Sequence, residues 1–192
     1  MANKLELIAQ RTALVVIDLQ KGIAQMPAEP HTGQSVVSRA GQLADRFRSV
    51  GAFVVLVHVG PSEDGGDALH PITDTETTWP TLPPGWDEIV AELGPQKGDH
   101  VIRKRQWGAF YGTDLDLQLR RRGIDTIVLC GISTNIGVES TARAAYEHGY
   151  QQIFVEDACS ARSSDEHHFT FQHIFPRIGR IRSTREVLDA LA

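Results

Sequence analysis

Two charged side chains follow apolar, strand-like runs of the sequence. Asp18 comes directly after Ala-Leu-Val-Val-Ile, and Lys104 ends the run Val-Ile-Arg-Lys. A carboxylate that leaves a buried strand at a crevice is partly desolvated, which raises its pKa and suits it to acid–base chemistry. A lysine in the same crevice would keep Asp18 ionised or polarise a substrate oxygen. Two simpler interpretations stay open: Asp18 could cap the next turn, and Lys104 could belong to a solvated basic edge with Arg103 and Arg105.

A third segment, from Cys130 to Thr141, joins a strand end to the start of a helix. Its small and polar residues include Ser133, Thr134, Asn135 and Gly137. Backbone N–H groups at such a helix start point outward and can hold an anion or an oxyanion. Every α/β unit contains a strand–turn–helix, so this segment indicates a site only in combination with Asp18 and Lys104.

An aromatic and glycine-rich stretch, residues 106–113, precedes another helical pattern and contains Trp107 and Phe110. It could wall an apolar pocket, or it could only turn the chain.

The elements that must position these residues alternate between strands and helices. Runs that are apolar on both faces are typical of strands covered on both sides, as in a parallel sheet. They occupy residues 13–17, 53–59, 126–130 and, more weakly, 152–155. Helical patterns occupy about residues 35–50, 113–122, 138–148 and 183–191. We therefore predict a three-layer α/β/α sandwich around a mostly parallel sheet.

Local signals support these helix ends. Gly51, Gly123 and Gly149 stand where the first three helices need a left-handed C-cap. Ser183 and Glu186 form a capping box for the last helix. In an open parallel sheet the binding crevice lies beyond the carboxyl ends of the strands, which is where Asp18 and Lys104 are expected.

Residues 60–100 interrupt the alternation with a stretch rich in proline and glycine, including Trp79 and Trp86. A connection of this length is either a lid or binding loop over the site, or a structural excursion that packs on the sheet edge.

Composition narrows the class of protein. A chain of 192 residues, 41% hydrophobic and 22% charged, is expected to fold as one globular domain over residues 1–192. A net charge of -5 argues against nucleic acid or an anionic membrane as partner. Two cysteines make no disulfide framework, and neither a secretion signal nor a membrane span is apparent, so the expected location is the cytoplasm.

Together these segments resemble the isochorismatase-like hydrolases, which include nicotinamidases, N-carbamoylsarcosine amidase-type enzymes and the isochorismatases. The resemblance covers nearly the whole chain, in the expected order. The matching pieces are residues 13–20, 101–104, 108–110, 123–134, 138–143 and 156–158. It implies the family fold and a site built on Asp18 and Lys104.

The chain departs from the amidase members at one position. Those members carry a nucleophilic cysteine at the position that matches Gly137, so covalent thioester chemistry has no nucleophile at the usual place. The isochorismatases resemble this chain in having glycine there, and they need no covalent intermediate: an aspartic acid protonates the vinyl ether carbon, water adds, and pyruvate leaves. Their turn reads differently, however, typically with Tyr-Ala-His where this chain has Ile-Ser-Thr.

Cys130 is expected to be a buried, inert thiol, whereas Cys159 could approach the crevice.

The resemblance also implies details of the site. Asp18 and Lys104 would be catalytic, and the backbone of Ser133 and Gly137 would hold the oxyanion, with a cis peptide bond between residues 132 and 133. The substrate pocket would be lined by Gln20, Trp107, Phe110, Thr134 and Asn135.

No metal and no other cofactor is expected. The nicotinamidase-type members hold a metal with an Asp-x-His pair, but Leu56 stands two residues before His58. Family members are commonly dimers or larger, and a homo-oligomer is expected here too, with Trp107, Phe110 and the 60–100 excursion offering apolar surface.

The predicted function is a cofactor-free hydrolase of a small, carboxylated metabolite, using non-covalent Asp/Lys chemistry and water attack. The alternatives are a catalytically silent binding protein that kept the pocket, and an amidase whose attack comes from water activated by Asp18 or from a relocated nucleophile such as Cys159.

Overall fold

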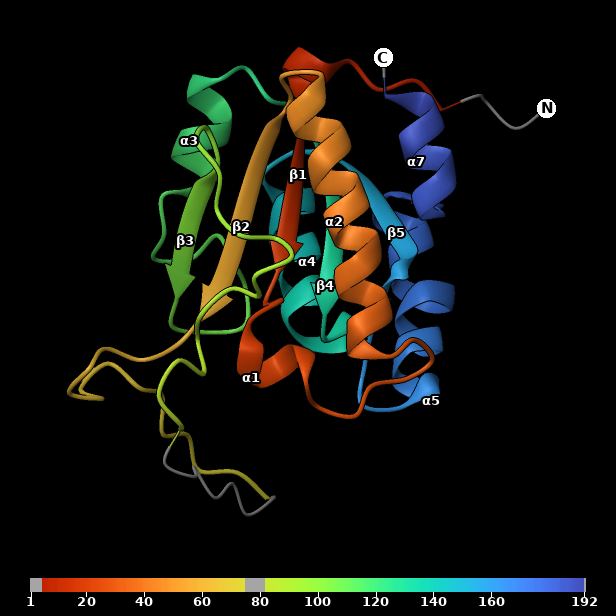
Figure 1. Cartoon of the computed structure of the whole chain (residues 1–192). Coiled ribbons are helices and arrows are strands. Elements are labelled where there is room, and N and C mark those ends of the chain that lie inside the picture. The colour runs from red at the N-terminus through yellow and green to blue at the C-terminus, as the bar shows by residue number, and fades with distance from the viewer. Residues whose placement is uncertain (1–4, 75–81, 192) are drawn as a thin grey trace.

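Six parallel strands form one twisted sheet, which runs through the middle of the molecule (Figure 1). The computed structural model describes residues 5–74 and 82–191. The strands follow the order β3-β2-β1-β4-β5-β6, and each neighbouring pair is parallel. They are β1 (Thr12–Ile17), β2 (Phe53–Val59), β3 (His100–Lys104), β4 (Thr126–Ile132), β5 (Gln151–Ser160) and β6 (Arg180–Arg182). The predicted sheet is confirmed, and in the described residues all of its pairings are parallel.

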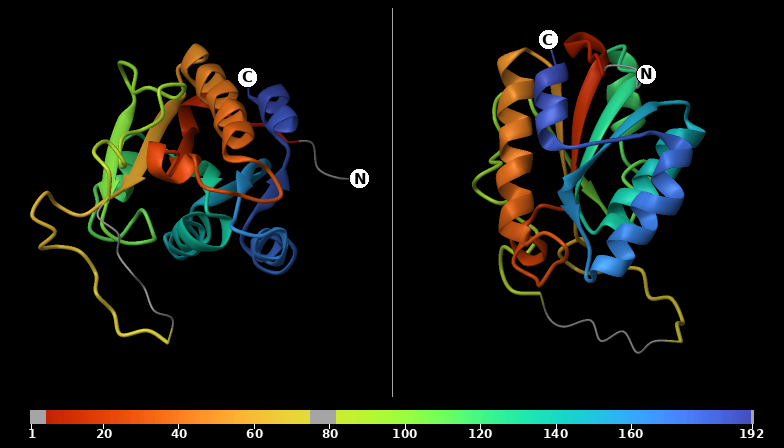
Figure 2. Two further views of the ribbon diagram at one scale, coloured as in Figure 1. Left: turned by 60° about the horizontal axis from the view of Figure 1, so that its bottom comes forward. Right: turned by 90° about the vertical axis from the view of Figure 1, so that its right-hand side faces the viewer.

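Helices cover both faces of the sheet (Figure 2). One face carries α2 (Gly33–Ser49) and α7 (Thr184–Ala190). The other carries α3 (Leu115–Arg121), α4 (Glu139–Glu147), α5 (Ser164–Phe169) and α6 (Phe175–Ile178). The short turns are α1 (Lys21–Ala24), η1 (Ala9–Arg11), η2 (Thr134–Val138) and η3 (Thr170–Ile174). Because both faces are covered, every residue of β1 is buried, which explains its apolar run without alternation.

The helix ends follow from local chemistry. The Ser183 side chain accepts a hydrogen bond from the Glu186 N–H, and the Glu186 carboxylate accepts one from the Ser183 N–H, so the predicted capping box begins α7. Gly123 has a φ of 66° after α3, which is the left-handed conformation that glycine adopts without steric cost.

The structure adds elements that hydrophobic patterning does not predict. Strand β5 extends five residues beyond the predicted 152–155 run, and β6 was not predicted because its three half-buried residues form no apolar run. The helix predicted over 138–148 is α4, and it is preceded by the π turn η2. Helices α5 and α6 were also not predicted.

The 60–99 connection leaves the carboxyl edge of the sheet, and its first part extends away from the body (Figure 1). Its last part is fastened to the body: the Val90 N–H donates to the Leu19 carbonyl, and a Cβ on Gly22 would lie 1.9 Å from Trp86. Residues 82–99 therefore match the structural excursion rather than a free lid, whereas Trp79 lies outside the described residues.

Within the two described ranges, no helix is both long enough and apolar enough to cross a membrane.

Candidate active site

Asp18 follows β1 directly and is held in an unusual backbone conformation. Its φ is 55°, the only positive φ of a non-glycine residue in the described part of the chain, and its N–H donates to the Val57 carbonyl at 2.9 Å. Left-handed backbone at a residue other than glycine is uncommon, and such conformations gather at functional sites. The strand end thus turns at the residue that carries the predicted carboxylate.

Lys104 forms a buried ion pair with Asp18. The distance from Lys104 Nζ to Asp18 Oδ2 is 2.7 Å, and the two side chains are 1% and 6% exposed. Nζ also donates to the carbonyls of Gln106 at 3.2 Å and Trp107 at 2.7 Å. An ammonium has three N–H groups, so these contacts use all of them. Of the two roles predicted for Lys104, the geometry matches the one that keeps Asp18 ionised and leaves no N–H to polarise a substrate oxygen.

The other carboxylate oxygen of Asp18 is the open position of this pair. Asp18 Oδ1 is buried and has no hydrogen-bond partner among the described residues. Burial raises the pKa of Asp18 to about 6, and the nearby Lys104 ammonium only partly offsets this effect. At neutral pH the carboxylate is therefore mostly ionised, with one acceptor oxygen free for a water or a substrate.

Gly137 lies against this pair. A Cβ added to Gly137 would lie 2.9 Å from Asp18 Oδ2, 3.0 Å from the Ile17 side chain and 3.4 Å from Lys104 Nζ. The turn η2 brings Gly137 there: the N–H of Val138 donates to the Ser133 carbonyl at 3.2 Å, which is the i to i−5 bond of a π turn. Such turns are rare and occur often at functional sites.

The peptide bond between Ile132 and Ser133 is cis, as the family resemblance implied. The structure thus brings together Asp18, Lys104, Gly137 and the turn that begins at Ser133.

Two further predicted residues lie on this turn. Thr134 is fully buried, and its Oγ1 forms a 2.9 Å hydrogen bond with His167 Nδ1. Asn135 has a buried Oδ1 without a hydrogen-bond partner in the described residues. Asn135 is therefore a second polar side chain of the turn with an acceptor left open.

Two predicted pocket residues, Gln20 and Phe110, are engaged in other contacts. Gln20 is fully buried, and its side-chain amide donates to and accepts from the backbone of Val59, so it serves the sheet edge. Phe110 is buried, 5.1 Å from the His148 ring and 5.8 Å from the Tyr150 ring. Gln20 is engaged by hydrogen bonds and Phe110 by packing. Both sets of contacts join segments that are distant in the sequence, so the sequence alone did not show them.

Trp107 contributes its carbonyl to Lys104, while its side chain is 65% exposed. It does not wall a closed pocket over Asp18 in this structure.

Thr141 is a site residue that the sequence did not single out. Its hydroxyl donates to the Gly137 carbonyl at 2.7 Å and accepts from the Ala109 N–H at 3.1 Å. It therefore ties the 106–113 stretch to the turn that carries Gly137. A threonine in the first turn of a helix is too common to have been a signal.

Neither cysteine is available as a nucleophile. Cys130 and Cys159 are fully buried. Burial raises the pKa of Cys130 to about 12 and the pKa of Cys159 well above its ordinary range. Because the thiolate is the reactive form, a fully buried thiol with a raised pKa is a poor nucleophile.

The described residues contain no cluster of three or more His, Cys, Asp or Glu side chains arranged to hold a metal ion. His58 is engaged with the protein itself, since its Nδ1 lies 2.7 Å from the Asp87 carbonyl.

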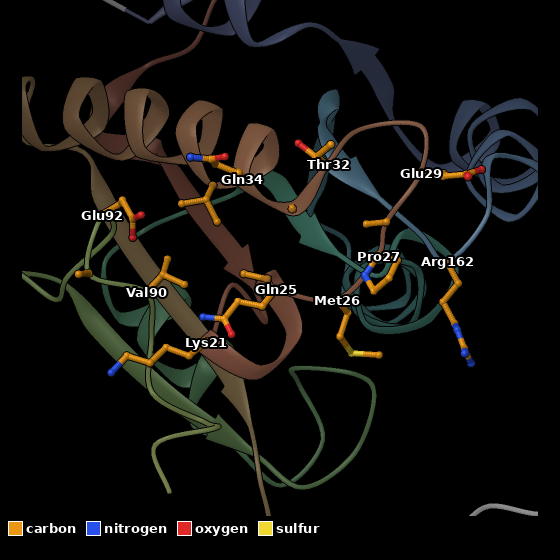
Figure 3. A pocket seen from close by; sticks show the side chains of 15 residues that line it. Lys21, Gln25, Met26, Pro27, Glu29, Thr32, Gln34, Val90, Glu92 and Arg162 are labelled. Atoms are coloured by element: carbon orange, nitrogen blue, oxygen red, sulfur yellow. The ribbon is translucent and has the colours of Figure 1, made fainter. Parts of the chain in front are cut away.

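A cavity of about 800 Å³ opens between α1, the start of α2 and residues 90–92 (Figure 3). Glu92 and Arg162 stand toward its opposite sides, with Met26 and Pro27 between them (Figure 3). Asp18, Lys104 and Gly137 do not line it. The buried pair and this cavity are therefore separate features.

Comparison with known proteins identifies the chain. Residues 12–186 match the family described as "Isochorismatase domain". The chain is 58% identical over 187 residues to the "Uncharacterized isochorismatase family protein YecD" of Escherichia coli O157:H7, covering 97% of this chain and 100% of that one. It is 32% identical to the ureidoacrylate amidohydrolase RutB of Variovorax paradoxus, over 80% of this chain and 70% of that one.

A solved structure of an isochorismatase family protein from Burkholderia thailandensis superposes with a TM-score of 0.93 at 46% identity, covering 98% of each chain. The parallel sheet, the order of its motifs and these relatives agree, and the chain belongs to the isochorismatase family of hydrolases.

Proposed function

We propose that this protein is a cofactor-free hydrolase of a small, carboxylated metabolite, in which Asp18 activates the attacking water. The observation that carries the proposal is the geometry of the Asp18 carboxylate: Oδ2 is held by Lys104 at 2.7 Å, whereas Oδ1 is buried and has no hydrogen-bond partner in residues 5–74 and 82–191. A buried carboxylate with one free oxygen and a pKa of about 6 matches what a general base near neutral pH requires.

The proposed reaction forms one bond from the water oxygen to the substrate carbon and breaks the bond to the leaving group, while Asp18 carries one proton from the water to that group. A water molecule donates a hydrogen bond to Asp18 Oδ1 and attacks the electrophilic carbon of the substrate while Asp18 takes the proton. Backbone N–H groups of the turn from Ser133 to Gly137 stabilise the negative charge that develops on the substrate oxygen. The bond to the leaving group then breaks, and Asp18 returns the proton to that group. Gly137 has no side chain, so no covalent bond to the enzyme forms at that position.

Lys104 acts by holding Asp18 in place. Because its three N–H groups are used by Asp18, Gln106 and Trp107, it orients the carboxylate and favours its ionised form. The carboxylated substrate class is supported by the relative named for ureidoacrylate, itself a carboxylate.

A second candidate reaction uses the same residue in its other protonation state. With a pKa of about 6, about a tenth of the Asp18 carboxyl is protonated at pH 7. Protonated Asp18 could donate its proton to a vinyl ether carbon, after which water adds. The amidase with Cys159 as relocated nucleophile loses support, because that thiol is buried.

The test replaces Asp18 by asparagine and measures turnover of small amides, esters and vinyl ethers. A general acid or base contributes about 10²–10⁴-fold, so Asp18→Asn should lower turnover of any accepted substrate by that factor. Asp99→Asn is the matched control, because Asp99 is also a buried carboxylate, paired with Arg48 at 2.7 Å but away from the site. Asp18→Asn with wild-type turnover would refute the proposal. Binding of these compounds without turnover by the wild type would instead identify a silent binding protein.

A further inference from the structure

The turn that carries Gly137 is held from the neighbouring helix α5, which packs beside it on the same face of the sheet (Figure 2). At the start of the turn, Thr134 Oγ1 forms its 2.9 Å hydrogen bond with His167 Nδ1. Just beyond its end, the Glu139 carboxylate accepts a hydrogen bond from the Thr170 hydroxyl at 2.7 Å. His167 of α5 and Thr170, the first residue of η3 directly after α5, thus contact both ends of the turn.

The contact at Thr134 is the more deeply buried of the two. Thr134 is 0% exposed and His167 is 1% exposed. The Phe171 ring lies 4.6 Å from the imidazole, with an interplanar angle of 32°. A hydrogen bond enclosed in this way has no water to replace it, so its loss leaves an unsatisfied polar group.

His167 is a neutral imidazole at physiological pH. Burial lowers its pKa to about 4, and the nearby His168 and His31 lower it in the same direction. The rings of His168 and His31 lie 5.5 Å and 6.0 Å from it. Neutral imidazole keeps one nitrogen as donor and one as acceptor, which suits a fixed bond to a hydroxyl.

On its other side, the same turn places Gly137 against the Asp18 carboxylate. We propose that His167 is a positioning residue, which acts through Thr134 to hold η2 and Gly137 against Asp18 and so shields that carboxylate from bulk solvent, leaving Oδ1 room for the single attacking water. The proposal rests on the proposed function, because it matters for catalysis only if Asp18 is the acid–base residue. It assigns α5 a role in the site although the side chain that holds Asp18 by a hydrogen bond comes from β3.

The consequence is measurable without a substrate. If the turn loosens, water reaches Asp18 and the main cause of its raised pKa weakens, while Lys104 still stabilises the charged form. The pKa of Asp18 should then fall toward its ordinary value of about 4.

The experiment titrates the Asp18 carboxyl carbon by NMR in carbon-labelled protein. Thr134→Val keeps the shape of the side chain and removes the hydroxyl, and His167→Phe keeps a ring and removes the nitrogen. Both should lower the pKa of Asp18 by about one pH unit or more. Thr134→Ser retains the hydroxyl and should leave the titration unchanged. Tyr150→Phe is the control, since it removes a 2.7 Å hydrogen bond to Asp116 at the opposite end of the sheet.

Folding of each variant is checked by circular dichroism before titration. A folded Thr134→Val protein whose Asp18 titrates as in the wild type would overturn the proposal, and so would an equal effect of Tyr150→Phe. If Thr134→Val does not fold, the comparison of His167→Phe with Thr134→Ser decides. The Asp18→Asn test is independent of these results, because it can abolish turnover whether or not α5 positions the turn.

Discussion

At the scale of single residues, the site consists of one carboxylate whose two oxygens have different surroundings. Oδ2 of Asp18 accepts a hydrogen bond from the Lys104 ammonium, and Oδ1 has no donor among the residues that the structure describes. Burial removes the hydration shell of the carboxylate and raises its pKa, and the single Lys104 ammonium only partly offsets this effect. The proposed acid–base role of Asp18 therefore depends on its burial more than on its partner.

The pH dependence of activity follows from this pKa. The base mechanism needs ionised Asp18, so kcat/KM should rise with pH, with a midpoint near 6, and level off above about pH 7. The acid mechanism needs the protonated carboxyl and gives the opposite sign, with kcat/KM falling above pH 6. A pH–rate profile of the wild type distinguishes the two reactions, and a profile with no inflection between pH 5 and 7 would contradict both.

A side chain at position 137 should damage the site. In Gly137→Ala the new Cβ would lie within 3.0 Å of Asp18 Oδ2 and the Ile17 side chain, so the pair or the turn has to move. We expect a loss of about 1–3 kcal/mol in the free energy of unfolding, typical of overpacking, and at least about a 10²-fold fall in turnover. Gly137→Cys carries the same Cβ and should show the same loss rather than a new thioester activity.

Gly41→Ala is the control for that substitution. Gly41 lies inside α2, and a Cβ there would meet only the Glu92 carbonyl at 3.8 Å, an ordinary contact. Alanine in a helix interior should raise the free energy of unfolding by about 0.5–1 kcal/mol and leave turnover unchanged. Stable, fully active Gly137→Ala would show that the site has room there.

At the scale of elements, the parallel arrangement of the strands brings the site together. β1 and β3 are separated in the sheet by β2, yet both end at the same edge, where Asp18 and Lys104 meet. The turn after β4 reaches the same edge from the other side of β1. The helices that pack on the sheet help to fix these strand ends, and a helix is fixed in turn by the caps at its own two ends.

The capping box of α7 offers a test of this at one helix. Ser183→Ala removes the side chain that accepts from the Glu186 N–H, and it should lower the free energy of unfolding by about 1 kcal/mol. The measurement is the urea midpoint at unchanged slope. Ser49→Ala near the end of α2 is the comparison, since its hydroxyl makes only a local bond to the Arg46 carbonyl and should cost less than about 0.5 kcal/mol. Equal midpoints for the two variants would contradict the assignment of a functional cap.

At the scale of the whole molecule, apolar side chains remain exposed next to the site. Trp107 is 65% exposed and Tyr111 is 82% exposed, both on the connection between β3 and α3. Phe110, which was predicted to share this surface, is buried instead. Exposed aromatic side chains that lie together commonly mark interfaces between proteins.

We therefore predict a homo-oligomer, a dimer or larger, that uses the Trp107 surface. Trp107→Glu places a charge in that surface and should shift the protein toward monomers in light scattering at micromolar concentration. Ile8→Glu is the control, because Ile8 is also exposed, at 56%, but precedes β1 at the opposite edge of the sheet. A monomeric wild type at that concentration would contradict the prediction.

The sequence by itself determined most of the strands and the longer helices, and it selected the residues proposed for the site. The apolar runs of β1, β2 and β4 report burial on both faces, a local property that each run carries without its partners. Asp18 and Lys104 could be selected because each ends such a run, and parallel strands end at one edge. The capping box of Ser183 was equally visible, since both of its residues lie within one helical turn.

The tertiary structure decided how the side chains are used, because hydrogen bonds between distant segments leave no periodic trace in the sequence. The three acceptors around Lys104 define it as the residue that holds Asp18, and two of them are backbone carbonyls that any residue could supply. Gln20 pairs with the Val59 backbone, and Cys159 is buried in β5. Both outcomes depend on segments that are distant in the sequence. His167 lies 33 residues from Thr134, and only packing of α5 beside the turn brings the two side chains into contact.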